Sequence, residues 1–249
     1  MHSQQKDFVK GIFIFGKDFK TNDILELGSF NVNGSIRDFE VFKESNHIGC
    51  DLTDGPGVDI VYDGVNLDLD RKFDITISCE VFEHDPHFIS TFQSLINYKA
   101  PRGIVIFTCA SRGRGEHGTQ RTNPNDSPGT SAVGIDYYRN VNKRDIQKKI
   151  NLKDYFDNHF FHYHKSSNDL YFFGETGYHY SKSEILALKK NVIQFIEMRE
   201  DIMPLKPNIL SYLDFLPRLI LSYYDDLRYQ NYMILRTKIS QKIKSFFSL

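Results

Sequence analysis

Asp23-Ile24-Leu25-Glu26-Leu27-Gly28-Ser29-Phe30-Asn31-Val32-Asn33-Gly34 is the stretch that decides the fold. It is typical of an apolar strand that runs into a glycine-bearing turn, and a second apolar run, His47-Ile48-Gly49-Cys50, ends at Asp51. A strand, a glycine turn, a helix and a strand closed by a carboxylate form a nucleotide-binding βαβ unit, in which the acid accepts the ribose hydroxyls. The sequence therefore predicts a nucleotide-type ligand near Gly28 and Asp51.

Apolar runs alternate with amphipathic ones between residues 23 and 109, which predicts a parallel sheet with helical crossovers. The expected strands are Ile24–Leu27, His47–Cys50, Ile60–Tyr62, Phe73–Cys79 and Gly103–Cys109. Before the last strand we expect a helix capped by Asp85, with Pro86 in its first turn. Lys99-Ala100-Pro101-Arg102 is expected to end that helix.

The chain changes character at Ala110–Gly134, which is rich in Gly, Ser, Asn, Pro, Arg and Thr. A connection this long in a compact domain is a lid, a binding loop or a disordered segment. A helix over roughly 143–151 is expected next. A strand pair, Phe160–His164 and Leu170–Phe173, then closes the sheet through a short turn.

From Ser181 onward the pattern is helical. One helix over 181–203 presents an apolar face, and a last helix over roughly 219–247 follows a stretch interrupted by prolines. We therefore expect one main domain over residues 1–180, in which residues 110–135 form the substrate loop or lid. Residues 181–249 are expected to form a C-terminal helical extension.

Composition excludes several classes of protein. The 249 residues carry a net charge of −1, so there is no overall bias toward nucleic acid. The three cysteines have no metal-like or redox-like spacing, and an odd number argues against a disulfide framework. The first residues, MHSQQKDFVKG, lack the apolar core of a signal peptide, and no apolar run reaches the length of a membrane span. The expected location is the cytoplasm.

Positive charge is concentrated at the C-terminus, where five cations and no acid follow Asp226: Arg228, Arg236, Lys238, Lys242 and Lys244. The last helix has three interpretations: docking on the domain or on a second subunit, contact with an anionic membrane surface, or contact with nucleic acid. Docking is the default, because the apolar residues of this helix need cover. We expect no nucleic-acid partner.

The chain resembles the class I S-adenosylmethionine-dependent methyltransferases over roughly residues 20–175. Glu26-Leu27-Gly28, Asp51 and Phe73-Asp74-Ile75-Thr76-Ile77-Ser78-Cys79-Glu80-Val81-Phe82-Glu83-His84 carry this resemblance. Two further stretches, Gly55-Pro56-Gly57-Val58-Asp59 and Asp136-Tyr137-Tyr138-Arg139, are similar to features of a bacterial subgroup that methylates small molecules or sugars.

The resemblance implies an α/β fold with a Rossmann-like, seven-stranded, mostly parallel sheet, an antiparallel last strand and helices on both faces. It implies S-adenosyl-L-methionine as cofactor and S-adenosyl-L-homocysteine as product. The cofactor is expected across the carboxyl ends of the first, second and fourth strands. One departure is that Phe30 and Val32 replace the second and third glycines of the family's first turn. Because S-adenosylmethionine has no pyrophosphate, the phosphate-cradling reason for those glycines weakens.

The resemblance also implies which residues bind the cofactor. Asp51 is expected to accept the ribose hydroxyls, Glu26 to meet the amino or methionine end, and Asp63 to accept from the adenine amine. Structural alternatives are a turn cap for Asp51, a paired core carboxylate for Glu26 and a turn residue for Asp63. The expected set is completed by Gly28, Ser29, Asn33, Leu52, Gly64, Cys79 and Glu80.

Methyl transfer is an in-line displacement that benefits from positioning and, for a hydroxyl acceptor, from a general base. His117 in the polar loop is the candidate base and His84 the second catalytic candidate. Their alternatives are a solvated loop histidine and a structural hydrogen-bonding residue. The acceptor is expected to meet Asp136, Tyr137, Tyr138 and Arg139. No metal site is predicted, because strand histidines such as His159, His162 and His164 are usually structural.

The predicted function is therefore transfer of a methyl group to a small-molecule, sugar or glycan acceptor, with oxygen as the favoured acceptor atom. The alternatives are N- or C-methylation on the same fold, and a non-catalytic S-adenosylmethionine-binding partner protein. A nucleic-acid methyltransferase is disfavoured, because Glu80-Val81-Phe82-Glu83 stands where such enzymes carry a D/N-P-P-Y/F string. Peripheral membrane contact and a homodimer through the C-terminal helices are both left open.

Overall fold

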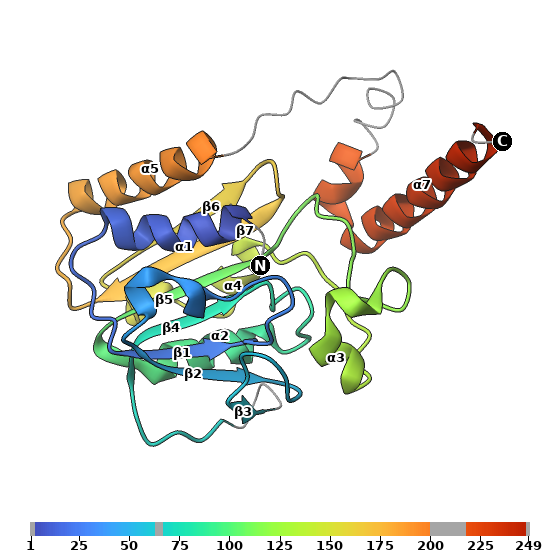
Figure 1. Cartoon of the computed structure of the whole chain (residues 1–249). Helices are drawn as coiled ribbons and strands as arrows, with labels where there is room; N and C mark the ends of the chain where they lie inside the picture. Colours follow the sequence, from blue (N-terminus) through green and yellow to red (C-terminus); the bar gives the residue numbers. More distant parts are fainter. Residues whose placement is uncertain (1–2, 63–66, 200–217, 248–249) are drawn as a thin grey trace.

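A seven-stranded mixed sheet forms the centre of the computed structural model, which describes residues 3–62, 67–199 and 218–247 (Figure 1). The strand order is β3-β2-β1-β4-β5-β7-β6. β7 runs antiparallel to β5 and β6, and the remaining strands run parallel to one another. The strands are β1 (Asp23–Leu27), β2 (Asn46–Asp51), β3 (Ile60–Val61), β4 (Phe73–Cys79), β5 (Lys99–Ala110), β6 (Asn158–His164) and β7 (Asp169–Thr176). The predicted mostly parallel sheet with a reversed last strand is confirmed.

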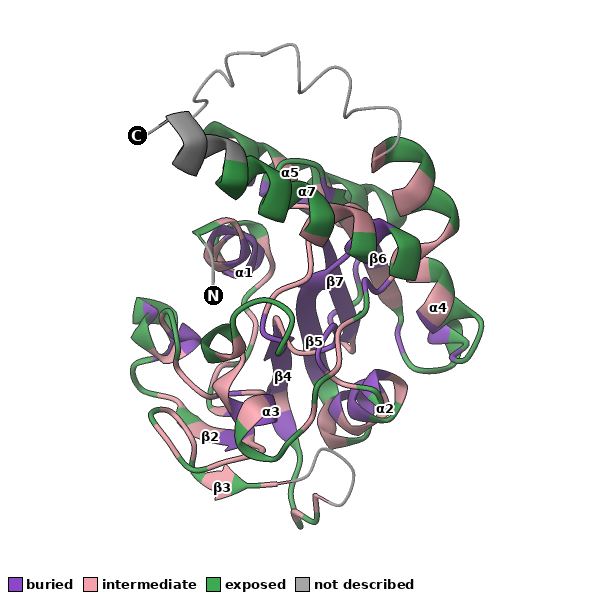
Figure 2. Cartoon of the chain, turned by 90° about the vertical axis from the view of Figure 1, so that its right-hand side faces the viewer, coloured by how far each residue is buried: buried purple, intermediate pink, exposed green. Residues whose placement is uncertain are grey.

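Helices cover both faces of this sheet (Figure 2). α1 (Ser3–Phe15) and α5 (Lys182–Arg199) lie side by side on one face, and α2 (Phe88–Tyr98) and α4 (Lys143–Gln147) lie on the other. The last helix of the chain is α7 (Asp226–Phe247). The described residues 218–224 are also helical, and they precede α7. Shorter helical turns are η1 (Ile36–Asp38), η2 (Glu40–Phe42), η3 (Pro124–Asp126), α3 (Pro128–Ala132) and η4 (Leu152–Asp154).

Two apolar clusters, one on each face of the sheet, form the core. The alternation of side chains along a strand explains the division: in β5, Ile104 and Ile106 face α1 and α5, whereas Val105 and Phe107 face α2. α1 contributes Phe8, Val9 and Ile12 to the first cluster, together with apolar residues of α5. α5 therefore packs on the sheet domain although its residues lie beyond position 180.

Several predicted elements differ in extent. β5 begins at Lys99, directly after α2, so the expected break before Gly103 is part of the strand. The helix predicted over 143–151 ends at Gln147 and is followed by η4, and the last helix is interrupted at Asp225. Asp85 does not occupy the cap position of α2, which is His87; its Oδ1 atom accepts from the His87 N–H at 2.6 Å instead.

The connection between β1 and β2 contains two 3₁₀ turns, η1 and η2, where the sequence predicted a crossover helix. Asn31, Asn33 and Gly34 lie in this connection, and such residues favour turns over helix. Ser35 then caps η1 by accepting from the Arg37 N–H. α1 was not predicted from the sequence. Residues 63–66 and the proline-containing stretch from 200 to 217 lie outside the described residues.

Candidate active site

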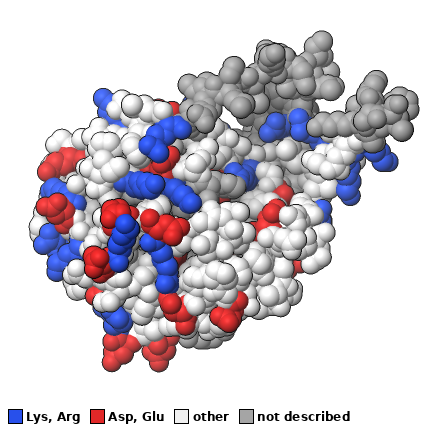
Figure 3. Space-filling model, in the orientation of Figure 1, with Lys and Arg blue, Asp and Glu red and all other residues white. Residues whose placement is uncertain are grey.

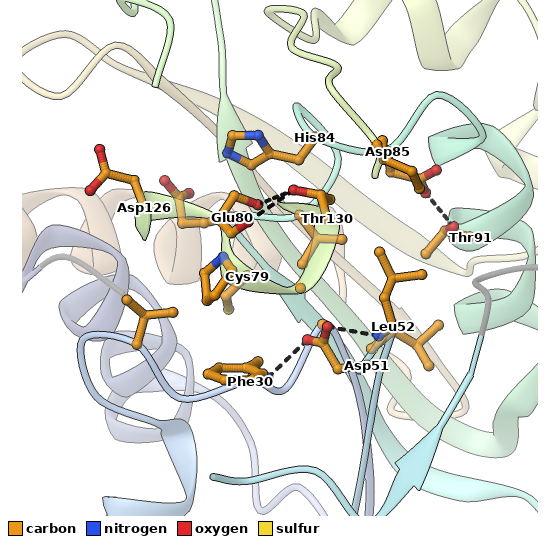
Figure 4. Close-up of a pocket in the computed structure, with 18 of the residues that line it drawn as sticks. Phe30, Asp51, Leu52, Cys79, Glu80, His84, Asp85, Thr91, Asp126 and Thr130 are labelled. Carbon is orange, nitrogen blue, oxygen red and sulfur yellow. Dashed lines mark hydrogen bonds between the residues drawn. The ribbon is translucent and has the colours of Figure 1, made fainter. Parts of the chain in front are cut away.

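A cavity of about 790 Å³ opens at the carboxyl ends of β1, β2 and β4. The segment over residues 110–135, with α3, forms its opposite wall. In Figure 4, Asp51 lies at one end of the cavity and His84 at the other, with Cys79 and Glu80 between them. Its volume is within the range of small-molecule and cofactor sites. The cavity therefore joins the parts of the chain from which site residues were predicted.

The Gly28 turn forms the floor beside β1. Gly28 has a φ of +80°, a backbone conformation that L side chains rarely adopt. A Cβ atom at this position would lie 2.0 Å from Val81 Cγ2, so the turn passes directly against the residue after Glu80. Asn33 also lines the cavity, whereas Ser29 is buried behind the turn. Gly28 is therefore required by both conformation and space.

Asp51 is held in place by backbone groups. Its Oδ2 atom accepts from the Phe30 N–H at 2.9 Å and its Oδ1 atom from the Leu52 N–H at 2.7 Å. Burial raises the pKa of the carboxyl, and these N–H groups oppose the rise. α3 approaches closely, since a Cβ on Gly129 would lie 2.5 Å from Asp51 Oδ1. The carboxylate thus stands between the glycine turn and the 110–135 segment, with lone pairs left on both oxygens.

Glu26 does not line the cavity. Its Oε2 atom lies 2.9 Å from His47 Nε2, and both side chains are buried within the sheet. This pairing corresponds to the structural alternative of a paired core carboxylate, here with a histidine. The cofactor-binding role of Glu26 stays a prediction.

Three acids gather where β4 ends: the buried Glu83 and Asp169, and the half-buried Glu80. Burial and the neighbouring Glu83 raise the pKa of Glu80 well above its ordinary value, and burial raises that of Glu83 to about 7. Arg114 faces this group, with its Nη1 atom 3.6 Å from Asp169 Oδ1. The end of β4 is therefore an acid-rich region with one guanidinium, which favours a positively charged ligand.

His84 and His117 come together at the far end of the cavity. Their ring centroids lie 4.9 Å apart with the planes at 87°, and the Tyr138 ring lies 5.4 Å from one and 5.1 Å from the other. Burial lowers the pKa of His84 to about 3 and also lowers that of His117. His117 Nδ1 lies 3.2 Å from the Gly115 carbonyl oxygen. Both imidazoles are therefore neutral near pH 7.

Comparison with solved structures finds methyltransferases. NodS, an N-methyltransferase from Bradyrhizobium japonicum WM9 in complex with S-adenosyl-L-homocysteine, is 10% identical over 70% of this chain and 85% of its own, with a TM-score of 0.42. The O-methyltransferase of a trans-AT PKS multienzyme of Brevibacillus brevis is 11% identical over 78% and 83%, with a TM-score of 0.46. Phosphoethanolamine N-methyltransferase 2 of Haemonchus contortus is 15% identical over 88% of this chain and 49% of its own, with a TM-score of 0.44.

No protein-family model matches the chain, and no curated protein is significantly similar to it in sequence. The order and direction of its own strands decide the architecture, with β4 next to β1 and the reversed β7 between β5 and β6. The chain has a Rossmann-like α/β fold with a reversed last strand.

Only some of the remaining predicted residues lie at the cavity in this fold. Cys79 and Leu52 line the cavity, and burial raises the pKa of the Cys79 thiol, so this thiol is protonated near neutral pH. Asp63 and Gly64 lie outside the described residues. Arg139 pairs with Asp145 at 2.9 Å, away from the cavity.

Of the other three predicted acceptor residues, Tyr138 contacts both histidines with its ring, and the backbone of Tyr137 hydrogen-bonds to His84. Asp136 Oδ1 accepts from the Gln120 N–H at 2.9 Å, and Tyr137 is half-buried without lining the cavity. The substrate-binding roles of all four residues stay predictions.

Asp169 and Gly129 were not predicted as site residues from the sequence. Asp169 was placed only as the last residue of a turn, yet it is fully buried and accepts from Gln5 Nε2 of α1 at 2.9 Å. Glu83 was part of the quoted motif without a role of its own. No local pattern links these positions, because they meet only when β4, β5 and β7 lie side by side.

Proposed function

We propose that the protein is an S-adenosylmethionine-dependent methyltransferase that acts on a small-molecule or sugar-like acceptor, with oxygen as the favoured acceptor atom. The observation that carries this proposal is one cavity, in a Rossmann-like α/β fold with a reversed last strand, with Gly28 and Asp51 at one end and two neutral histidines at the other. This arrangement suits a donor and an acceptor that meet near the end of β4.

The residues present fit the cofactor. Gly28 keeps the β1 turn free of side-chain atoms, and Asp51 offers free lone pairs on two backbone-anchored oxygens that suit a pair of ribose hydroxyls. When bound, S-adenosylmethionine supplies an electrophilic methyl group on a sulfonium. The carboxyl of Glu80 favours a positive charge beside it, and exclusion of water strengthens that preference.

The other end of the cavity is suited to a hydroxyl. His117 is neutral near pH 7 and presents a nitrogen lone pair, so it is the proposed recipient of the acceptor's proton. His84, whose pKa burial lowers to about 3, is a much weaker base and the less suitable candidate. Tyr138 supports both rings. The 110–135 segment, which carries His117 and α3, is proposed as the substrate loop.

N- or C-methylation on the same scaffold remains the alternative chemistry, and a non-catalytic S-adenosylmethionine-binding protein the alternative class. The proposed partner is a small molecule or sugar in the cytoplasm, without nucleic acid. None of the described helices contains an apolar stretch long enough to cross a membrane.

The C-terminal helix supports both surface hypotheses that the sequence raised. α7 exposes apolar side chains, including Leu227, Leu235 and Ile239, beside exposed basic ones. Figure 3 shows basic side chains gathered around this part of the molecule. A homodimer and a peripheral membrane contact through α7 are both compatible with that surface.

Isothermal titration calorimetry with S-adenosylmethionine tests the proposal. Asp51→Ala is expected to weaken binding at least tenfold, because a hydrogen bond to a charged group contributes about 1.5–3 kcal/mol and 1.4 kcal/mol corresponds to tenfold. Asp54→Ala, an exposed acid outside the cavity lining, is the matched control. Absence of binding at millimolar cofactor, or full affinity in Asp51→Ala, would contradict the proposal. Unchanged turnover of the true acceptor in His117→Ala would remove the base role.

A further inference from the structure

Glu83, His84 and His117 form a group with the composition of a metal site. Each offers one ligand atom, and these atoms all lie within 4.8 Å of one another. Glu83 and His84 follow β4, whereas His117 comes from the 110–135 segment, so the group joins the sheet to the loop across the cavity. The histidines of β6 are not members of this group.

Several buried polar atoms in the group are incompletely satisfied. The Glu83 side chain is 0% exposed, and the backbone N–H groups of Glu83 and Ala110 approach its carboxyl, but among the described residues neither oxygen makes a hydrogen bond of normal geometry. The same holds for Nδ1 of His84 and for Oε2 of the neighbouring Glu80. A buried carboxylate held only by weak backbone contacts is costly, and a bound cation would offset that cost.

The surroundings of the two imidazoles match those of metal ligands. The Gly115 carbonyl oxygen lies 3.2 Å from His117 Nδ1, and the backbone of Tyr137 hydrogen-bonds to His84. Metal-ligating histidines usually donate their second ring N–H to such a carbonyl, which orients the ring and leaves the other nitrogen for the metal. His117 Nε2 is therefore the atom available to a metal.

We propose that Glu83, His84 and His117 bind a divalent transition-metal ion such as Zn²⁺, Mn²⁺ or Co²⁺, with at least one coordination position open to the cavity. Two imidazoles and one carboxylate suit these ions better than Ca²⁺ or Mg²⁺, which prefer all-oxygen sites. Bonds of roughly 2.1 Å in a tetrahedral site hold ligand atoms roughly 3.4 Å apart, so the side chains close by about 1 Å on binding.

The metal site does not depend on the proposed function, but its role in methyl transfer does. A hydroxyl oxygen of the acceptor would occupy the open position, where the metal lowers the pKa of that hydroxyl. The O–H bond then breaks with the electron pair left on oxygen, and the proton leaves to water. With the metal bound, His117 is a ligand and not a base. The metal-bound hydroxyl would then lose its proton to water and not to the imidazole.

Binding of Co²⁺ to the full chain in the absence of S-adenosylmethionine tests the site. Equilibrium dialysis is expected to show one Co²⁺ bound per chain. The visible absorption spectrum of the bound Co²⁺ is expected to contain bands that indicate nitrogen ligation. His117→Gln is expected to lower the affinity at least about tenfold, since even outer-shell changes at metal sites cost 10–100-fold. His162→Gln, a half-buried histidine of β6 outside the group, is expected to bind Co²⁺ like the unchanged protein.

Equal affinity in His117→Gln and the unchanged protein, or loss confined to His162→Gln, would overturn the site. Because His84 and Glu83 are buried, their glutamine variants are compared only after circular dichroism shows an unchanged fold. Unchanged Co²⁺ affinity in both variants would also overturn the site.

Acetohydroxamate, a small oxygen ligand, probes the open position. A shift of the Co²⁺ bands on its addition supports an open site, and unchanged bands would overturn that part of the proposal. Calorimetry with S-adenosylmethionine is run separately, so failure of the cofactor site and failure of the metal site give different results.

Discussion

Gln230 of α7 accepts a hydrogen bond from the backbone N–H of Glu116, the residue before His117, at 2.7 Å. Its Nε2 atom donates to the Arg114 carbonyl oxygen at 3.0 Å. The two bonds hold the peptide groups on either side of Gly115, whose carbonyl oxygen lies 3.2 Å from His117 Nδ1. Gln230 is only 2% exposed, so this contact excludes water. The C-terminal helix is therefore part of the framework that positions His117.

Gln230→Ala is expected to loosen the loop without affecting Asp51. Loss of a buried hydrogen bond costs about 1–2 kcal/mol, so the Glu116 amide is expected to exchange with solvent roughly 5- to 30-fold faster. Hydrogen-exchange mass spectrometry over residues 113–118 measures this. Asn231→Ala, whose side chain contacts the exposed Arg121, is the matched control. Equal exchange in both variants would show that Gln230 does not hold the loop.

Gly28→Ala is expected to destabilise the protein by about 2–4 kcal/mol. A left-handed conformation costs roughly 1–2 kcal/mol for an L residue, and overpacking against Val81 adds a similar amount. Gly134→Ala is the control, because Gly134 has a φ of +77° but nothing within 4 Å of an added Cβ. It is expected to cost only the conformational part. Urea unfolding measures both, and equal losses would mean that the contact with Val81 relaxes freely.

His47→Leu is expected to destabilise the fold by about 2–4 kcal/mol, because it leaves the buried Glu26 carboxylate without the histidine 2.9 Å away. Adding Glu26→Gln is expected to recover at least half of the loss, since a neutral amide is less costly to bury than a carboxylate. Denaturant titration of both variants gives the comparison. A double variant no more stable than His47→Leu would show that the loss comes from packing instead.

Glu184 gives a pH-dependent contribution to the start of α5. The Ser181 backbone N–H donates to its Oε2 atom at 2.7 Å, and this bond, with the Ser181 hydroxyl and Lys17, lowers the pKa of Glu184 to about 2. A carboxyl with a lowered folded-state pKa stabilises the fold above its unfolded pKa of about 4.5 and loses that effect as the pH falls toward 2.

The unchanged protein is therefore expected to melt higher than Glu184→Gln near pH 7, with a difference that shrinks from about pH 4.5 downward. Thermal melts over pH 3–7 measure the difference. A gap that stays constant across this range would show that the capping bonds do not depend on ionisation.

Strong local periodicity explains which parts of the fold were predictable. β4 was predicted with its observed bounds, because the apolar residues of Phe73–Cys79 alternate with Asp74, Thr76 and Ser78, which is the period of a strand. The β6–β7 pair was recognisable from its short turn. The crossover after β1 was not, since the helix expected there yields to turn-forming residues around Gly34. α1 was missed because its buried face packs against α5 and against sheet residues such as Tyr171, which lie far along the chain.

The same distinction applies to the site. Gly28 and Asp51 were predictable because a glycine turn and a strand-end acid are local signals, each readable within a few residues. The sequence by itself determined the sheet and the placing of Gly28 and Asp51 at the ends of neighbouring strands, where they line the cavity. Only the tertiary structure decided that His117 meets Glu83 and His84, that Arg114 faces Asp169, and that Gln230 holds the loop. These contacts join segments far apart in the chain, and no short-range pattern records which of them the packing of the sheet brings together.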